Sequence, residues 1–390
     1  MNQTKIAFIY YPREPNSVRL DTMPFALNSV IALAKIGWNI DLYLWEDPSL
    51  NYQGLLPKNI TIKYFVEPPK NQFSLLLWYL QLQFPFKWQN NYLCVFGVSQ
   101  IGHYVAHTIA SHNRAPLVYF NDELPSHLGS DWENNRLTKL EKQIIHKAAM
   151  IVLPDSQRFQ PLCQELKISH SIPHAELPNI AITTNSIDSI DWHKRLGIPD
   201  SCIPFLHAGS IGDWAQVPEL LSSVPYWPKE AVLILHSRSS ERVEAYRKQL
   251  SHLEIAGRVF WSLEPMSESI LNSLVSYCAG NFALYRNSGP NIEYLGLSSG
   301  KLLRSLASGS PVIASDLASL SFVSEYQLGV LVSHPAEITK AIEKIIRDRE
   351  FYSNNCLQFC KNNLSFEMAW ETLCLKFKEV TNIDLYQPIP

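Results

Sequence analysis

Two loops in the second half of the chain carry residues that could hold a phosphate. The first contains Gly209, Ser210 and Gly212 and directly follows PFLHA, an apolar run that predicts a buried strand. Glycines let the backbone approach a ligand closely, and exposed consecutive amides suit an anion. A tight turn between a strand and a helix, without any ligand, would use the same residues. The first loop alone leaves both interpretations open.

The second loop combines small residues with the start of a helix. Ser299 and Gly300 precede the run KLLRSLAS, which begins at Lys301, has helical spacing and is followed by Gly309. The first amides of a helix lack partners within it, so these amides and the Lys301 charge could bind a phosphate. Ser298 or Ser299 could instead cap the helix. The phosphate interpretation is favoured because both loops leave the same predicted sheet.

Three other motifs fit this region poorly. Residues 296–300 match G-x-S-x-G, the nucleophile turn of serine hydrolases, but the nearest triad partners, Asp316 and His334, follow after only short connections. A P-loop needs four residues between its glycines and Ser or Thr after its lysine, whereas three residues and Leu302 stand here. The stretch 97–102 lacks the middle glycine of a dinucleotide fingerprint. Each of these sites is therefore disfavoured.

Acidic residues in the first half could act on a hydroxyl group. Asp122 and Glu123 follow PLVYF, a predicted strand, and could face a ligand at the carboxyl edge of its sheet. A carboxylate there could orient or deprotonate the hydroxyl, with Glu123 the first choice, Asp122 the second and His127 the third. An ordinary helix cap or surface charge is the alternative for each. Arg238 and Arg286, just past strands of the second half, could meet phosphate or be ion-paired.

Two parallel sheets are predicted to position these residues. Short apolar runs alternate with helical patterns from IAFIYY to MIVLP, and again from PFLHAGS to LGVLVS. This alternation is typical of α/β, doubly wound sheets. Polar and turn-forming residues at 183–200 indicate a linker. We expect two Rossmann-like domains, over 1–183 and 200–364, that face a cleft, followed by an amphipathic helix over 365–380.

The composition fits a folded protein with two cores. Of its 390 residues, 46% are hydrophobic and 18% are charged. The net charge is −3 without a basic block, so no nucleic-acid partner is expected. Signal-peptide features and apolar stretches of 18 residues are absent, and seven scattered cysteines lack a C-x-x-C pair. We expect a cytoplasmic protein with free thiols and no metal site.

Four segments of the second half resemble the C-terminal domain of GT-B glycosyltransferases, most closely the retaining family four. They are LHAGSIGDW, GRVFWSLEPMSESILNSL, SSGKLLRSLASGSPVIASD and LGVLVSHPAEITKAIEKIIRD, and they match in order and spacing over 204–350. The resemblance implies metal-independent transfer of a sugar from a nucleotide-diphosphate sugar, without a cofactor. It also implies that the domain over 1–183 is the acceptor side and that the helix over 365–380 packs back on it.

The resemblance assigns the diphosphate to both loops. The loop over 209–212 would face it, and the amides of Ser299, Gly300 and Lys301 would hold it. Negative charge develops on this leaving group as the glycosidic bond breaks, so Lys301 and the amides would lower the barrier.

The chain departs from the family pattern at the positions of two glutamates. The family carries Glu, seven residues, Glu before the helix end, and Gly296 and Arg304 stand at these positions. Glu293, three residues early, could replace the first glutamate, and Arg304 replaces the one that binds ribose. The N-terminal Gly-Gly loop is replaced by PREPNSVRLDTMP. Retention of configuration is favoured by the resemblance, and a degenerate protein that only binds nucleotide-sugar or glycan is the alternative.

The stretch over 73–88, FSLLLWYLQLQFPFKW, is apolar and aromatic but interrupted by Gln and Pro. It predicts a core helix, or a patch that touches a membrane or a lipid-linked glycan. Many relatives that build polysaccharides act on such acceptors. We therefore expect a glycan, lipid-linked or other hydroxyl acceptor and a role in polysaccharide or glycoconjugate biosynthesis. Contact with the inner membrane surface is expected only if the stretch forms the patch rather than the core helix.

Overall fold

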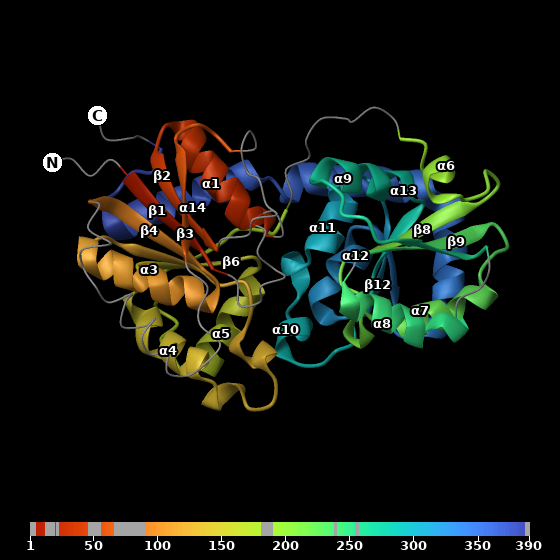
Figure 1. Ribbon diagram of the computed structural model, residues 1–390, viewed down its shortest axis with the longest axis horizontal. Helices are drawn as coiled ribbons and strands as arrows, with labels where there is room; N and C mark the ends of the chain where they lie inside the picture. The colour runs from red at the N-terminus through yellow and green to blue at the C-terminus, as the bar shows by residue number, and fades with distance from the viewer. Residues whose placement is uncertain are drawn as a thin grey trace. The chain divides into compact units, whose positions relative to one another are not determined.

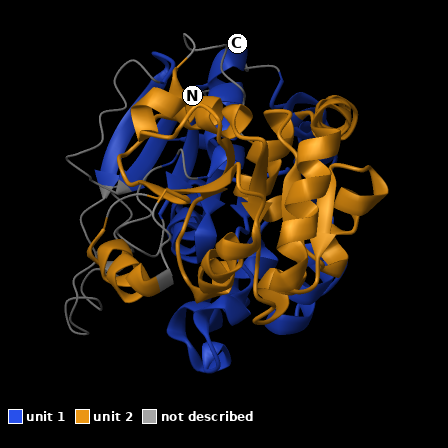
Figure 2. Ribbon diagram, turned by 90° about the vertical axis from the view of Figure 1, so that its right-hand side faces the viewer, with its two compact units in different colours: residues 1–179, 366–390 blue, residues 180–365 orange. Residues whose placement is uncertain are grey.

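The computed structural model of the protein describes residues 5–11, 20, 23–45, 56–65, 91–180, 190–237, 240–253 and 257–386. The chain divides into two units, each built around its own parallel sheet (Figure 2). Unit 1 comprises Met1–Asn179 and Phe366–Pro390, and unit 2 comprises Ile180–Ser365. The chain thus leaves the first unit, builds the second and returns to the first.

The sheet of unit 1 has seven parallel strands in the order β3-β2-β1-β4-β5-β6-β7 (Figure 1). Strands that are covered on both faces read as continuous apolar runs. The central pair follows this rule, since YLCVFGV is buried throughout and KIAFIY is buried except at its first residue. The strand bounds are β1 Lys5–Tyr10, β2 Asn39–Trp45, β3 Ile60–Phe65, β4 Tyr92–Val98, β5 Leu117–Phe120, β6 Met150–Leu153 and β7 His174–Glu176.

Five α-helices of the described part of unit 1 cover this sheet. Their bounds are α1 Pro24–Ile36, α3 Ser99–Asn113, α4 Arg136–Ile144, α5 Phe159–Leu166 and α14 Phe366–Thr381. The C-terminal helix α14 contacts β7 and α1. Its Phe377 ring lies 6.4 Å from the Phe96 ring of β4, and the Trp38 indole donates a 2.8 Å hydrogen bond to the Leu385 carbonyl. The last helix is therefore part of the unit 1 core.

The sheet of unit 2 has six parallel strands in the order β10-β9-β8-β11-β12-β13. Successive residues of β9 point to opposite faces, as a strand requires. Leu233 and Leu235 join one core cluster together with Leu220 and Ile342, while Ile234 joins a second cluster on the other face. The strand bounds are β8 Ile203–Ala208, β9 Ala231–His236, β10 Val259–Ser262, β11 Gly280–Ala283, β12 Val312–Ser315 and β13 Gly329–Val332.

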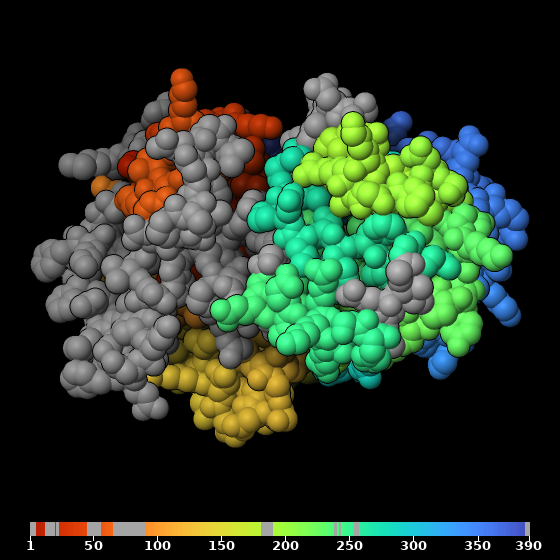
Figure 3. Space-filling view, turned by 45° about the vertical axis from the view of Figure 1, so that its right-hand side comes forward, coloured from red at the N-terminus to blue at the C-terminus, as the bar shows by residue number. Residues whose placement is uncertain are grey.

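The helices of unit 2 connect these strands and cover both faces of the sheet (Figure 1). Segments between α6 and α9, yellow-green to teal, form much of the unit 2 surface that is turned toward the viewer in Figure 3. The bounds are α6 Trp192–Leu196, α7 Val217–Ser223, α8 Glu241–Gln249, α9 Glu268–Tyr277, α10 Pro290–Glu293, α11 Gly300–Ala307, α12 Phe322–Glu325 and α13 Ile338–Asn363.

The predicted fold class, α/β with two Rossmann-like sheets, is confirmed. Local differences remain. Part of the polar segment expected to be a linker forms α6, because Trp192 is buried and packs with Ile198 in a core cluster of unit 2. The helix α13 runs from Ile338 to Asn363, with non-helical backbone at Asp348. In the described part of the chain, no helix is long and apolar enough to cross a bilayer. The stretch over 73–88 lies outside that part.

Candidate functional site

The strand order of unit 2 reverses between β8 and β11. The chain runs from β8 to β9 on one side of the sheet and later adds β11 on the other side of β8. At such a switch point the two connections diverge and leave a crevice beyond the carboxyl ends of the strands, where open α/β sheets bind ligands. The loop over 209–212 follows β8, and the segment that leads to α11 follows β11. Both predicted phosphate loops therefore lie at the switch point.

The loop over 209–212 contains three backbone amides without an acceptor among the described residues. Gly209 has φ of +126°, a conformation that strains any residue with a side chain, and its N–H donates to the His236 carbonyl at 3.0 Å. The N–H groups of Ser210, Ile211 and Gly212 donate no hydrogen bond to any described residue. Three consecutive unpaired N–H groups are donors that an anion could use.

His207 holds this loop in place through a hydrogen bond, a role that the sequence did not indicate. Its imidazole is fully buried, and its Nε2 lies 3.3 Å from the Ser210 carbonyl oxygen, to which it can donate. Burial, with a smaller effect from the Lys301 charge, lowers the pKa of His207 to about 3. The ring is therefore neutral, so it braces the loop without adding charge.

At the start of α11, the capping and phosphate interpretations apply to different residues. Ser299 is the N-cap: its Oγ accepts a 3.3 Å hydrogen bond from the Leu302 N–H and also bonds the Tyr285 hydroxyl. The N–H groups of Gly300 and Lys301 donate to no described residue. These two amides stand at the positive end of the helix dipole and are open to an anion.

The Lys301 side chain joins the two loops. Its Nζ lies 4.2 Å from the ring centre of Tyr285, just past β11, and 5.5 Å from that of Trp214, just past the first loop. The two rings stack with centroids 6.1 Å apart. Among the described residues, Nζ meets no carboxylate and forms no hydrogen bond. Burial lowers the pKa of Lys301 to about 7, so the arrival of an anion would restore its charge.

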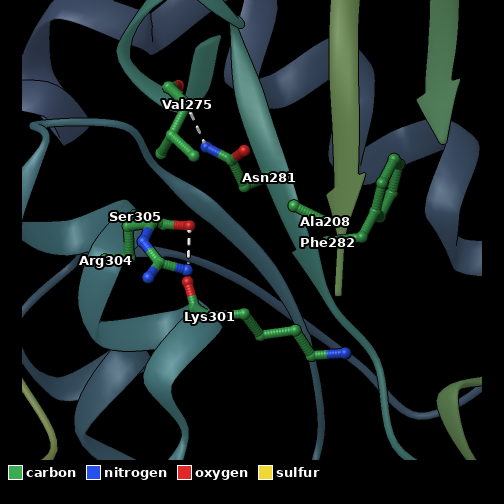
Figure 4. Close-up of a pocket in the computed structure, with 7 residues that line it drawn as sticks. All are labelled: Ala208, Val275, Asn281, Phe282, Lys301, Arg304 and Ser305. Atoms are coloured by element: carbon green, nitrogen blue, oxygen red, sulfur yellow. Dashed lines mark hydrogen bonds between the residues drawn. The ribbon is translucent and has the colours of Figure 1, made fainter. Parts of the chain in front are cut away.

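A small pocket lies beside Lys301, between the strand ends and α11 (Figure 4). Ala208 of β8 and Phe282 of β11 form its sheet side, and Arg304 and Ser305 form its helix side. An ion pair of 2.7 Å joins the Arg304 guanidinium to Glu268, the first residue of α9. The complete lining is Ala208, Val275, Asn281, Phe282, Lys301, Arg304 and Ser305.

The remaining donor-side candidates differ in their surroundings. Arg286 forms an ion pair with Glu219 and lies 3.4 Å from the Asp213 carbonyl, so it braces the first loop as an ion-paired arginine. Glu293 is exposed at the end of α10, and its carboxylate has no partner among the described residues. Arg238 lies outside the described residues.

The serine-hydrolase interpretation has no matching geometry. Ser298 ends a short 3-10 turn, Gly296–Ser298, rather than a sharp turn between a strand and a helix. The Asp316 carboxylate accepts a 2.8 Å hydrogen bond from Ser333. His334 accepts one from the Ala336 N–H at 3.2 Å and thereby caps the next turn. Both expected triad partners are thus engaged in local structure.

In unit 1, the predicted acidic residues follow β5 directly. The Asp122 carboxylate accepts a 2.8 Å hydrogen bond from Ser99, the first residue of α3. Burial, together with the neighbouring Glu123, raises the pKa of Asp122 to about 6. Glu123 is 45% exposed, and its carboxylate lies 3.8 Å from the buried Arg158 guanidinium. His127 is exposed, and its Nδ1 lies 2.7 Å from the Leu124 carbonyl.

A buried polar cluster next to β5 was not predicted from the sequence. The Glu141 carboxylate, 1% exposed, accepts hydrogen bonds of 2.6 Å from both the Tyr119 hydroxyl and the Gln100 amide. The Asn121 amide lies 3.5 Å from the same carboxylate and donates to the Glu123 carbonyl at 3.1 Å. The cluster therefore fixes the turn that carries Asp122 and Glu123. Its only signal in the sequence is an acid at the spacing of the buried face of α4.

Replacing Glu141 by glutamine is expected to change how stability depends on pH. Burial raises the pKa of Glu141 to about 7 from an ordinary value of 4.5, so the folded state holds this proton more tightly than the unfolded chain does. The tighter binding of this proton adds about 3 kcal/mol to the free energy of unfolding below pH 4.5. This stabilisation decreases as the pH rises and is lost above about pH 7. Glutamine has no such ionisation. Urea unfolding at pH 5, 6 and 7.5 should show a shallower decline for Glu141→Gln, and equal declines would contradict the assignment.

Comparison with known proteins identifies the fold. No protein-family model and no curated protein matches the sequence. A structure of HepE from Anabaena, in complex with UDP and glucose, aligns with a TM-score of 0.72 at 15% identity, over 97% of this chain and 100% of HepE. A sucrose-phosphate synthase from Thermosynechococcus elongatus aligns with a TM-score of 0.73 at 15% identity, over 97% and 100% of the two chains. The chain has the GT-B fold.

The GT-B fold confirms the resemblance at the level of architecture. A proposed UDP-N-acetylglucosamine 2-epimerase from Listeria monocytogenes also aligns, with a TM-score of 0.63 at 13% identity over 100% of both chains. One fold can thus support different reactions, and the reaction has to be argued from the site. Membership of retaining family four stays a prediction.

Proposed function

We propose that the protein is a glycosyltransferase that binds a nucleotide-diphosphate sugar at the switch point of unit 2. The observation that carries the proposal is Lys301, a half-buried lysine between two aromatic rings that has no carboxylate partner among the described residues. Unpaired amides stand at the start of its own helix and in the loop over 209–212. An ammonium that has lost part of its hydration without gaining a partner is costly, and an anionic ligand removes that cost. A diphosphate supplies negative charge for Lys301 and acceptor oxygens for the unpaired amides of both loops.

The same groups would promote the reaction. When the glycosidic bond breaks, the diphosphate leaves with added negative charge. Lys301, the amides of Gly300 and Lys301, and those of 210–212 are fixed donors that need no rearrangement to stabilise this charge. No metal is required in this scheme, because the lysine and the helix dipole supply the positive charge.

UDP is the first nucleotide to test, because HepE was crystallised with UDP and glucose. The resemblance to family four supports retention of configuration at the transferred sugar. The acceptor is proposed to be a hydroxyl of a glycan or a lipid-linked glycan. Asp122 would accept a hydrogen bond from this hydroxyl and orient it, since Ser99 holds the carboxylate in place.

A degenerate binding protein is the second candidate, favoured by the residues that replace the family glutamates. Gly296 has no side chain, and Arg304 is engaged by Glu268. A turnover measurement separates the candidates. The protein is incubated with UDP-glucose and UDP-N-acetylglucosamine, with and without glycan acceptors, and the released UDP and all sugar products are analysed by anion-exchange chromatography and mass spectrometry.

The glycosyltransferase proposal predicts release of UDP, slow with water and faster with a suitable acceptor. Donor binding without release would support the binding protein and contradict the transferase. Isomerisation of the donor sugar with UDP still attached would indicate an epimerase. In a transferase reaction, the anomeric coupling of the first product, read by NMR, tests retention.

A further inference from the structure

We propose that Glu268, held by Arg304, binds the ribose hydroxyls of the donor nucleotide. This inference rests on the proposed donor site and identifies the residue at its nucleoside end. It gives a role to an ion pair that the diphosphate interpretation leaves unused.

The ion pair joins a residue of the pocket lining, Arg304, to Glu268. The Arg304 guanidinium lies 2.7 Å from Glu268 Oε2, and the two side chains are 16% and 33% exposed. Arg304 lines the pocket beside Lys301 (Figure 4). Lys301 and Arg304 are three positions apart on α11, so their side chains lie on one face of the helix. A ligand whose phosphates meet Lys301 would therefore extend along α11 past Arg304.

Glu268 reaches Arg304 from a different helix. It is the first residue of α9, which follows β10, so it lies toward the carboxyl edge of the parallel sheet. The helices α9 and α11 contact each other. The diphosphate loops and the carboxylate thus belong to the same edge of the same sheet.

The chemistry of the carboxylate fits a vicinal diol. One oxygen of Glu268 is bound to Arg304, and the other has no partner among the described residues. In nucleotide-binding α/β sheets, an acidic residue near a neighbouring strand end accepts hydrogen bonds from ribose hydroxyls. Arg304 would fix the rotamer of the carboxylate, which lowers the entropy lost when the diol binds.

Two simpler roles explain less of the geometry. An acid in the first turn of α9 stabilises the helix dipole, but this requires no arginine partner. An exposed ion pair adds little stability, yet this pair is partly buried and its arginine lines a pocket. A ribose-binding role accounts for the acid, its arginine and their location together.

The test compares ribose with deoxyribose ligands. Calorimetry measures the affinity of UDP and of 2′-deoxy- and 3′-deoxy-UDP for the wild-type protein, Glu268→Gln and Glu268→Ala, with ADP and GDP pairs run in parallel. The wild type should prefer the ribonucleotide by about tenfold or more, because a charge-assisted hydrogen bond is lost with the hydroxyl. In Glu268→Ala the preference should approach one, with the affinity for deoxynucleotide unchanged.

Glu264→Gln is the matched control. Glu264 lies four residues earlier, is 83% exposed and pairs with Arg195 at 3.7 Å, so its variant should keep the wild-type preference. A wild-type protein that binds UDP and deoxy-UDP equally overturns the inference, and so does a preference that survives in both Glu268 variants. Unchanged affinity for deoxynucleotide also shows that the variants are folded. If no nucleoside diphosphate binds the wild type, the proposed donor site itself is wrong.

Discussion

Replacing Lys301 by alanine is expected to weaken binding of UDP-glucose by about ten- to a hundredfold. The variant loses the ammonium between Tyr285 and Trp214 and keeps the backbone amides of α11. Calorimetry on the wild type and the variant measures the change. Lys344→Ala is the control, since Lys344 also lies over a tyrosine ring, that of Tyr352 at 5.9 Å, but on α13. Equal affinities for the wild type and Lys301→Ala would contradict the assignment.

The same lysine predicts a pH dependence of binding. Burial lowers the pKa of Lys301 to about 7, and a bound diphosphate would raise it again. The protonated lysine binds, so the affinity should be constant below pH 7 and fall by up to about tenfold per pH unit above it. UDP-glucose is the suitable ligand because its diphosphate does not titrate in this range. The affinity of Lys301→Ala should be flat from pH 6.5 to 8.5.

Replacing Asp122 by asparagine is expected to lower turnover about a hundredfold and to leave donor affinity unchanged. Asparagine keeps the size of the side chain. With its carbonyl oxygen bound to Ser99, it presents an NH₂ group in place of the second carboxylate oxygen, which would accept the hydrogen bond from the substrate hydroxyl. Ser99 holds the carboxylate, and burial brings the pKa of Asp122 to about 6, near the working pH of a base. Initial rates of UDP release in the presence of acceptor measure turnover, and calorimetry measures donor affinity.

Two variants accompany Asp122→Asn. Glu123→Gln tests the residue that the sequence places first, and a smaller effect is expected because Glu123 is more exposed and faces Arg158. Asp131→Asn changes an exposed aspartate whose carboxylate accepts a hydrogen bond from Asn134, and it should leave turnover at the wild-type rate. Unchanged turnover in Asp122→Asn would rule out the orienting role, and a loss confined to Glu123→Gln would transfer that role.

The sequence predicts the sheets well because each buried parallel strand appears as a continuous apolar run in its own segment of the sequence. Runs such as YLCVFGV are apolar from end to end, and each forms a strand of the structure. Short elements between polar residues were not recoverable in this way. The strand β7 spans three residues, and α6 depends on the burial of Trp192. Their stability comes from tertiary contacts, which a local pattern does not contain.

The site was predictable where backbone chemistry decides it. The glycine loop and the start of α11 are visible as Gly and Ser next to strand and helix patterns, and the switch point places both at one sheet edge. The rings around Lys301 and the pair of Arg304 with Glu268 join residues that are distant in sequence. Such contacts depend on how the elements pack, so motif spacing did not predict them.

A calorimetric titration of the wild-type protein with UDP, GDP, ADP and CMP and their sugar conjugates, with and without EDTA, shows whether the chain holds a metal-independent site for a nucleotide-diphosphate sugar. We expect saturable binding of one nucleoside diphosphate and its sugar conjugate, unaffected by EDTA and weakened in Lys301→Ala. If no diphosphate binds, or if EDTA abolishes binding, the proposed donor site is wrong.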